Sequence, residues 1–402
     1  MAPYELAIVG GGPAGISTAL HLQAADPQLA GRIVVLEKES YPREKYCAGG
    51  VAGRALKKLA ALGVRLDVPQ VPFEACALRV PGEDLVVRTP GFGAVVRRIE
   101  FDHALAKVAM DRGIEVRQGA GVQSVDLRPD GVTLRLADGT VEARAVVGAE
   151  GVGGVVRRAM GLGGGTLRAQ VIECDTEPVL GDPPRDTILF DASDRTLGGY
   201  GWDFPTLVDG QEKVCRGIYV IRPLGQENVH ERLRAYLERR GLRMEDYRLK
   251  PFGERGFEPG TPIAAPRALL VGEAAGIDIA TGEGIAQAIH YGELAGPYLA
   301  RALRCGRLDF SDWGRVVKRS SLGVNLFFRL LMYRSFYPER ERTERTLRNN
   351  RALMELFALE FAGNPIGPRP FLAAMAHTPP ADVPWAMGIA RRLFAGDVNV
   401  RS

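Results

Sequence analysis

The chain has 402 residues, a net charge of +4 and 46% hydrophobic residues. Its 52 basic residues are scattered among 48 acidic ones, which gives little support to nucleic-acid binding, and the length favours two or three domains. Five cysteines without a Cys-x-x-Cys pair argue against a disulfide framework, and five histidines without ligand spacing predict no metal site.

A glycine-rich turn follows the first predicted strand. Residues 6–9 are an apolar run typical of a buried parallel strand, and a helical apolar pattern begins at Ile16. Between them, Gly10 permits a tight turn, Gly12 lets the backbone approach a pyrophosphate, and Gly15 lets helix and strand pack closely. The helix N-terminus presents free N–H groups to the phosphates, so the segment predicts a dinucleotide site. The predicted contacts are Gly10, Gly12, Pro13, Ala14 and Gly15.

A second apolar strand, residues 33–36, ends in an acidic residue. This residue, Glu37, follows the glycine turn by about 20 residues, where a carboxylate can accept both hydroxyls of an adenosine ribose. We therefore predict that Glu37 and its neighbour Lys38 contact the dinucleotide.

Two later apolar runs, residues 145–149 and 268–271, also lead into glutamate and glycine. Each carboxylate therefore stands at the end of a strand of the same predicted sheet. The predicted contacts are Glu150, Gly151, Gly272 and Glu273.

Three such motifs in this order resemble the large FAD-dependent family of aromatic hydroxylases, flavin halogenases and geranylgeranyl reductases, over the chain to about residue 300. The resemblance implies FAD as the cofactor. The family usually has Asp-Gly in the second motif and Gly-Asp in the third, whose carboxylate holds the ribityl chain. This chain has Glu150 and Glu273 at those positions, and Gly154 where the family often has Ser. Arg98 matches a family arginine that reaches the pyrophosphate, and Val122 is predicted as a further cofactor contact.

Residues 42–50 are similar to the Pro-Arg-x-Lys-x-Cys-Gly-Gly segment of the geranylgeranyl reductase branch, with one alanine inserted after the cysteine. In the family this segment passes beside the flavin ring. Glycines let backbone lie close to a flat ligand, and a basic pair suits a phosphate or a reduced, anionic flavin. The predicted contacts are Lys45, Cys47, Ala48, Gly49 and Gly50.

Residues 200–205 are similar to the Tyr-x-Trp-x-Phe-Pro motif of the same branch. At period two, Tyr200, Trp202 and Phe204 fall on one strand face and form an aromatic wall that can hold an apolar chain, with an ordinary core face as the alternative. Halogenases carry Trp-x-Trp-x-Ile in the comparable place, which argues against chlorination. The candidate catalytic residues are Tyr200 and Trp202 for positioning and Cys47 beside the flavin, and the proton source stays open between Cys47, Tyr200 and water.

Residues 280–285 precede a predicted helix, so their backbone N–H groups can face the pyrimidine edge of the flavin, which becomes negative on reduction. The sequence Thr-Gly-Glu-Gly-Ile is typical of the reductase branch. The predicted contacts are Gly282, Gly284 and Ile285.

These assignments predict an α/β fold with a Rossmann-like FAD-binding domain, an inserted antiparallel β-sheet substrate domain and a C-terminal helical region. The FAD-binding domain would comprise residues 1–70, 97–160 and 262–300. Residues 71–96 and 165–261 would form the substrate-binding domain. Residues 301–402 would form the helical region and a tail that begins at Asn364-Pro365.

In the helical region, residues 324–332 are densely apolar and bracketed by Arg319, Arg329 and Arg334. The run is too short and too charged to cross a bilayer. It could rest on a membrane surface, line a lipid tunnel or form a core helix. The first strand begins within a few residues of Met1, so we expect no secretion signal and a cytoplasmic protein, with peripheral membrane contact left open.

The resemblance implies reduction of isolated carbon–carbon double bonds in a prenyl or lipid-like substrate, with hydride from flavin N5 and a proton for the other carbon. No second complete nucleotide fingerprint is present, so NAD(P)H would dock transiently or a ferredoxin-like protein would deliver electrons. A flavin-dependent monooxygenase or halogenase acting on a hydrophobic or aromatic substrate is the alternative function. A non-catalytic prenyl-binding carrier is a further one.

Overall fold

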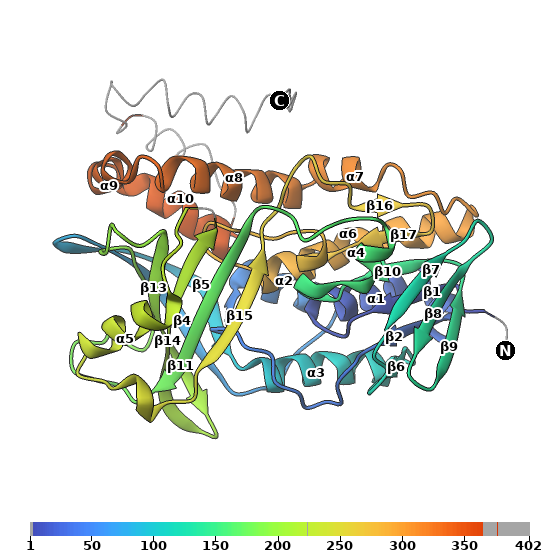
Figure 1. The fold of residues 1–402 in the computed structure, drawn as a ribbon, viewed down its shortest axis with the longest axis horizontal. Helices are drawn as coiled ribbons and strands as arrows, with labels where there is room; N and C mark the ends of the chain where they lie inside the picture. Colours follow the sequence, from blue (N-terminus) through green and yellow to red (C-terminus); the bar gives the residue numbers. More distant parts are fainter. Residues whose placement is uncertain (1–2, 223, 365–375, 377–402) are drawn as a thin grey trace.

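The computed structural model describes residues 3–222, 224–364 and 376. The strands of these residues form three sheets, of six, eight and three strands. Figure 1 shows the six-stranded sheet toward the N-terminal end of the molecule and the eight-stranded sheet at the opposite end. The predicted tail after Asn364 lies, apart from residue 376, outside the described residues.

The six-stranded sheet carries the first glycine motif and has the order β16-β17-β10-β1-β2-β6. All of its pairs are parallel except the short β16–β17 pair. Strands β1 and β2 are apolar and buried along their whole length, which confirms the parallel strands predicted there. The strands are β1 (Leu6–Val9), β2 (Ile33–Leu36), β6 (Glu115–Arg117), β10 (Val146–Gly148), β16 (Ala264–Ala265) and β17 (Ala268–Leu270).

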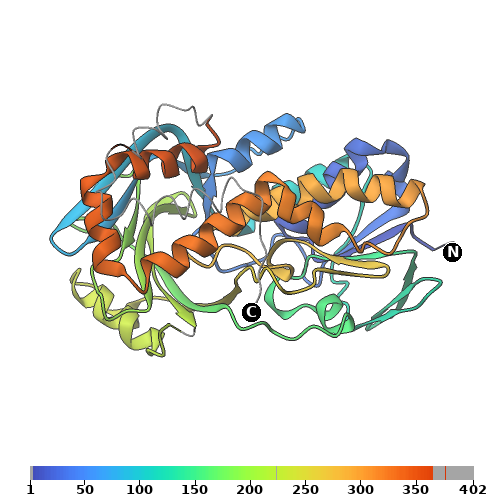
Figure 2. The same ribbon diagram turned by 90° about the horizontal axis from the view of Figure 1, so that it is seen from above.

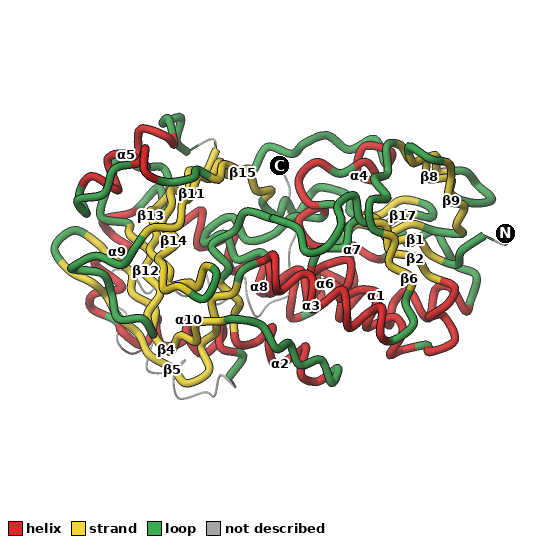
Figure 3. Tube along the Cα trace, turned by 90° about the horizontal axis from the view of Figure 1, so that it is seen from below, coloured by secondary structure: helices red, strands yellow, loops and turns green. Residues whose placement is uncertain are grey.

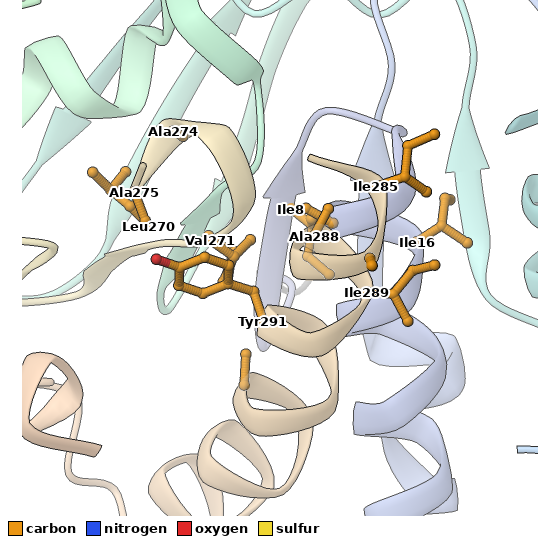
Figure 4. Packing of buried hydrophobic residues seen from close by; sticks show 14 of the residues in the cluster. Ile8, Ile16, Leu270, Val271, Ala274, Ala275, Ile285, Ala288, Ile289 and Tyr291 are labelled. Carbon is orange, nitrogen blue, oxygen red and sulfur yellow. The ribbon is translucent and has the colours of Figure 1, made fainter. Parts of the chain in front are cut away.

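Helices α1 (Pro13–Ala25) and α6 (Ile285–Arg304) pack closely against each other beside this sheet. Glycines of α6 allow the close approach, since a Cβ atom at Gly296 would lie 2.5 Å from the His21 Cβ atom on α1. Figure 4 shows Ile16 of α1 next to Ile285 and Ile289 of α6. The helix that follows the third glycine motif is therefore fixed against the helix that follows the first.

The eight-stranded sheet has the order β15-β11-β14-β13-β12-β4-β5-β3. Its pairs are antiparallel except β4–β12, so the predicted antiparallel sheet is confirmed apart from one parallel pair. The long stretch of chain between β4 and β12 makes a parallel pair possible, because parallel strands need a crossover connection. The strands are β3 (Gly50–Ala52), β4 (Gln70–Val80), β5 (Glu83–Val96), β11 (Arg168–Thr176), β12 (Thr187–Asp191), β13 (Gly199–Val208), β14 (Gln211–Arg222) and β15 (Lys250–Arg255).

The three-stranded sheet was not predicted and consists of β7 (Ser124–Leu127), β8 (Val132–Leu136) and β9 (Gly139–Ala143). The domain boundaries given above stay predictions. The remaining helices are α2 (Gly53–Ala61), α3 (Arg98–Asp111), α4 (Val155–Ala159), α5 (Val229–Glu238), α7 (Trp313–Arg319), α8 (Ser321–Phe336), α9 (Arg340–Asn349) and α10 (Arg351–Ala362). Figure 3 shows loops together with helices α3, α6 and α8 between the two larger sheets.

Helix α8 carries the apolar run and lies in the middle of the molecule, next to α6 (Figure 2). Leu322, Leu326 and Leu330 are buried in the core, whereas Val324 is 48% exposed. Arg329, one of the three arginines named with the run, has a fully buried side chain that lies against carboxylates. None of the described helices is long and apolar enough to cross a membrane.

Candidate functional site

The three glycine motifs contact one another at the carboxyl ends of β1, β10 and β17. A Cβ atom at Gly10 would lie 2.5 Å from the Ala149 carbonyl oxygen, and one at Gly272 would lie 2.6 Å from the Ala14 Cβ atom. Gly10 and Gly272 also have φ angles of 106° and 59°, which favour glycine. Segments that are far apart in the sequence therefore meet backbone to backbone, and side chains at these positions would hold them apart.

Within the first motif, a Cβ atom at Gly15 would overlap the Gly10 carbonyl oxygen, which confirms the close helix–strand packing predicted there. Pro13 is the first residue of α1, where its missing N–H group costs no hydrogen bond. The second and third motifs also adjoin, since a Cβ atom at Gly151 would lie 3.3 Å from Glu273 Oε2.

Gly12 precedes α1, and its open side faces two guanidinium groups. A Cβ atom there would lie 3.8 Å from Arg43 Nη2 and 3.8 Å from Arg98 Nη2. Asp102 orients both groups, because Arg98 donates to it twice at 2.7 Å and Arg43 lies 3.0 Å away. The N-terminus of α1 and two oriented cations form a cradle suited to a pyrophosphate. Arg43 was not among the predicted contacts, although it lies in the 42–50 segment.

The Glu37 carboxylate ties this cradle to the first motif. It accepts a hydrogen bond from the Gly11 N–H group at 2.9 Å and lies 3.3 Å from Arg43 Nη2. By contrast, the ammonium group of Lys38 is exposed and lies 3.6 Å from Glu39. Val122 is half-buried against the core. The contacts of Glu37, Lys38 and Val122 with a dinucleotide stay predictions.

Glu150 and Gly154, the two departures from the family pattern, compensate for each other. Glu150 Oε1 accepts a hydrogen bond from the Val156 N–H group at 2.6 Å and so caps the start of α4. A Cβ atom at Gly154 would lie 2.8 Å from Oε1, so serine would crowd the longer acid. Burial raises the pKa of Glu150 to about 7.

Glu273, the acid of the third motif, is close enough to Lys45 and Glu254 to interact electrostatically with both. Burial raises the pKa of both carboxyl groups, and the Glu273 charge adds to the rise at Glu254. The Lys45 ammonium group opposes the rise at both acids. The 42–50 segment and the third motif therefore converge, which brings together two segments predicted to contact the flavin.

Glycines let the 42–50 segment lie tightly on the eight-stranded sheet. Gly49 has a φ angle of 81°, and a Cβ atom there would overlap the Val96 carbonyl oxygen. A Cβ atom at Gly50 would lie 3.1 Å from the Phe204 ring. Ala48 is half-buried against the core.

Cys47, in the same segment, is half-buried. Its backbone N–H group donates to Glu173 Oε1 at 2.9 Å, and its Sγ atom accepts from the Gly49 N–H group at 3.4 Å. Burial raises the pKa of the Cys47 thiol, and the thiol therefore keeps its proton at neutral pH.

The aromatic side chains of β13 lie on one face of the strand and are almost fully buried. Tyr200, Trp202 and Phe204 are 7%, 3% and 7% exposed. Phe190 of β12 extends this wall, with ring centroids 5.3 Å from Tyr200 and 5.4 Å from Phe204. Tyr219 of β14 stacks on Tyr200 at 5.0 Å. We refer to these five rings as the aromatic wall.

The loop of residues 280–285 is tied to the aromatic wall. Tyr200 donates a hydrogen bond to the Thr281 carbonyl oxygen at 2.6 Å. The Ala280 and Thr281 N–H groups donate to Asp278 at 2.7 and 3.2 Å, so only N–H groups beyond Thr281 can face a ligand. Gly282 has a φ angle of 68°, and a Cβ atom there would lie 3.2 Å from the Tyr200 hydroxyl oxygen.

The loop ends at Gly284, which precedes α6, and at Ile285, the first residue of that helix. A Cβ atom at Gly284 would lie 2.9 Å from Ile277 Cδ1, and Ile285 is 4% exposed. Both residues therefore pack against the core, and only their backbone N–H groups are suited to a ligand.

A buried network of ion pairs also holds this loop. The network consists of Arg54, Asp278, Glu283, Arg329 and Glu360. Arg54 donates to the Glu283 carboxylate and lies 2.8 Å from Glu360 Oε1. Arg329 Nη2 lies 3.1 Å from Glu360 Oε2 and 3.4 Å from Glu283 Oε2. Burial raises the pKa of Glu283 to about 7, although both arginines oppose the rise. The network thus joins α2, α8 and α10 to the loop.

None of these five residues was predicted as a site residue, nor were Glu173, Tyr219 and Glu254. Tyr219 had a signal, since the sequence of residues 214–220 is typical of a strand. In the part of the chain that the structure describes, no group of three histidine, cysteine or acidic side chains could hold a metal ion.

Comparisons with known proteins agree with this geometry. A family model described as "FAD binding domain" matches residues 4–188. Digeranylgeranylglycerophospholipid reductase 2 of Methanothermobacter thermautotrophicus is 28% identical over 348 residues, which cover 80% of this chain and 85% of the relative.

Two solved structures share the fold. A geranylgeranyl bacteriochlorophyll reductase-like protein from Thermoplasma acidophilum has a TM-score of 0.75 at 20% identity, covering 96% of this chain and 99% of its own. The flavin-dependent brominase Bmp2 has a TM-score of 0.72 at 18% identity, covering 97% and 100%. The family match and the Gly12 cradle together support FAD binding.

Proposed function

Because the chain is a geranylgeranyl reductase-like, FAD-dependent oxidoreductase, we propose that it reduces carbon–carbon double bonds in a prenyl or other lipid-like substrate. One observation carries the proposal: the aromatic wall is bonded through Tyr200 to the loop that would face the flavin ring. The reductase named among the relatives supports a lipid-like substrate. When bound and reduced, FAD supplies a hydride from its N5 atom.

The residues described above divide into those that would hold the cofactor and those that would hold the substrate. Gly12, Arg43 and Arg98 would bind the pyrophosphate. Lys45 and the backbone of residues 282–285 would lie along the flavin ring, where a cation and N–H groups favour the reduced, anionic form.

The aromatic wall would position the substrate. An isolated alkene has no carbonyl group that an acid could polarise, so the protein acts by holding the double bond at reacting distance and excluding water. Tyr200 and Trp202 are proposed as the positioning residues. The Tyr200 hydroxyl already donates to Thr281, which favours a positioning role over proton donation.

We propose that electrons come from NAD(P)H that docks transiently or from a ferredoxin-like protein. We also propose peripheral membrane contact, because the substrate is lipid-like.

Product analysis with and without oxygen tests the proposed reaction. The reduced holoenzyme is incubated with a geranylgeranyl lipid under nitrogen and in air, and the products are identified by mass spectrometry. We expect a saturated product in both conditions, heavier by two hydrogen atoms for each reduced bond. Product formed only in air would contradict the proposal.

A flavin-dependent monooxygenase or halogenase is the second candidate, favoured by the fold shared with the brominase. Both reactions require oxygen. Oxygen consumption that matches hydroxylated or halogenated product would establish this candidate in place of the reductase.

Replacing Trp202 with alanine tests the aromatic wall. We expect substrate reduction to slow by about 100-fold, because a misplaced double bond loses its alignment, while the flavin content stays unchanged. Absorbance spectra and single-turnover rates measure the two effects. Trp202→Phe is the matched control and should retain most of the rate. Equal loss of flavin and rate would mean that Trp202 supports the fold instead.

A further inference from the structure

Glu173 is a buried carboxyl group on the face of the sheet that carries the aromatic wall. Its side chain is 0% exposed. Glu173 of β11 pairs in register with Gly217 of β14, which pairs with Trp202 of β13. Residues directly opposite each other on antiparallel strands share a face, so Glu173 and Trp202 lie on the same side, one strand apart.

Gly217 leaves the space between these two side chains open. A Cβ atom at Gly217 would overlap the outer edge of the Trp202 indole ring, which therefore lies across Gly217 toward Glu173. The carboxyl group of Glu173 is thus next to the ring that we propose positions the substrate.

Only one oxygen of this carboxyl group accepts a backbone hydrogen bond. Oε1 accepts the Cys47 N–H group at 2.9 Å, whereas Oε2 is buried without a hydrogen bond of good geometry among the described residues, and the neighbouring Cys215 thiol is only a weak donor. An unpaired buried carboxylate oxygen is costly, and a catalytic role is one of the reasons for which a folded protein keeps one. A neutral carboxyl group with a proton on Oε2 would lower that cost.

Charged and titratable groups surround Glu173 on every packed element. Lys250 of β15 lies opposite it in register and is 2.6 Å from Asp175 of β11. The Cys215 thiol of β14 adjoins the carboxyl group. Burial raises the pKa of Glu173 to about 7, a rise that the Lys250 charge opposes and the Asp175 charge increases. The group can therefore hold or release a proton near neutral pH.

A cavity between the 42–50 segment and the sheet reaches Glu173. Its lining includes Cys47, Arg98, Asp175, Cys215 and Lys250 as well as Glu173. Glu44 and Lys45, which are exposed, also line it. The cavity, of about 30 Å³, therefore lies between the surface residues Glu44 and Lys45 and the Glu173 carboxyl group, which is itself 0% exposed.

We propose that Glu173 is the proton reservoir of the site. The inference rests on the proposed function, in which the π bond is replaced by two C–H bonds, one from the hydride and one from a proton. Glu173 releases that proton to the site as its O–H bond breaks, and water in the cavity restores it. Storing the proton beside the aromatic wall allows reduction of an alkene without opening the substrate site to solvent.

The first test needs no substrate. The midpoint potential of the bound flavin is measured against pH in wild-type holoenzyme and in Glu173→Gln, which keeps an oxygen for the Cys47 N–H group. Reduction places negative charge near Glu173 and should draw a proton onto it above about pH 7. There we expect the wild-type slope to exceed the variant slope by one proton per two electrons, about 30 mV per pH unit. Equal slopes would overturn the proposal.

Two variants keep this comparison interpretable. Glu177→Gln, on an exposed residue just after the same strand, should behave as the wild type. Glu254→Gln removes another buried acid on this sheet face. If Glu254→Gln abolishes the extra proton uptake and Glu173→Gln does not, the reservoir is Glu254 and the proposal for Glu173 is wrong.

The second test uses single turnovers with a prenyl substrate. The wild-type rate should fall as pH rises through the pKa of Glu173, because the proton is lost. Glu173→Gln should be slower by about 100-fold or more and lack this step, and Glu173→Asp should recover part of the rate. An unchanged rate in Glu173→Gln would contradict the proposal. If the wild type reduces no alkene, the proposed function fails, while the potential measurement still decides whether Glu173 stores a proton.

Discussion

Gly12→Val is expected to yield folded protein without FAD. Gly12 has a φ angle of −77°, so valine causes no backbone strain. Its side chain would instead occupy the space in front of Arg43 and Arg98, where the pyrophosphate is expected. The measurement is the visible absorbance of the purified protein after incubation with FAD, together with a circular dichroism spectrum.

Gly31→Val is the matched control for Gly12→Val. A Cβ atom at Gly31 meets no other atom within 4 Å, so this variant should bind FAD as the wild type does. Retention of full flavin content in Gly12→Val would mean that the cofactor does not approach the first glycine motif.

Arg329→Leu is expected to destabilise the protein by about 3–5 kcal/mol. The Arg329 side chain is fully buried between three carboxylates, and its loss leaves Arg54 alone to balance Asp278, Glu283 and Glu360. Uncompensated buried charge accounts for the large effect. Urea unfolding measures it, and weaker flavin binding should accompany it because the network holds the 280–285 loop.

Arg334→Leu provides the control for Arg329→Leu, because Arg334 is an exposed residue of the same helix. Its effect on the free energy of unfolding should stay within about 0.5 kcal/mol. Similar effects of the two substitutions would show that the buried ion network contributes little to stability.

The sequence was sufficient to predict the parts of the fold that depend on local patterns. Apolar runs predicted β1 and β2, and period-two aromatic residues predicted the shared face of β13. The first glycine motif predicted close packing of helix and strand at Gly15, and the structure confirms it against the Gly10 carbonyl oxygen. Such features are readable because each follows from a short segment of chain.

Features that depend on distant segments could not be predicted. Arg54, Glu283, Arg329 and Glu360 come from four elements, and only the tertiary structure shows that they meet. The apolar pattern of residues 324–332 left the surroundings of Arg329 open, because hydropathy does not show which charges have buried partners.

Compensation between neighbouring positions was also hidden. Glu150 and Gly154 each departed from the family pattern, and read separately each weakened the match. The structure shows that the longer acid uses the space that glycine leaves and caps α4. Two departures from a motif can therefore preserve its backbone geometry.

The most direct test of the proposed function is an anaerobic single turnover with a measured stoichiometry. Reduced holoenzyme is mixed with a geranylgeranyl lipid, flavin absorbance is followed to completion, and the saturated bonds are counted by mass spectrometry. We expect one saturated bond for each flavin oxidised. Flavin that stays reduced until oxygen is admitted, with no saturated product, would contradict it.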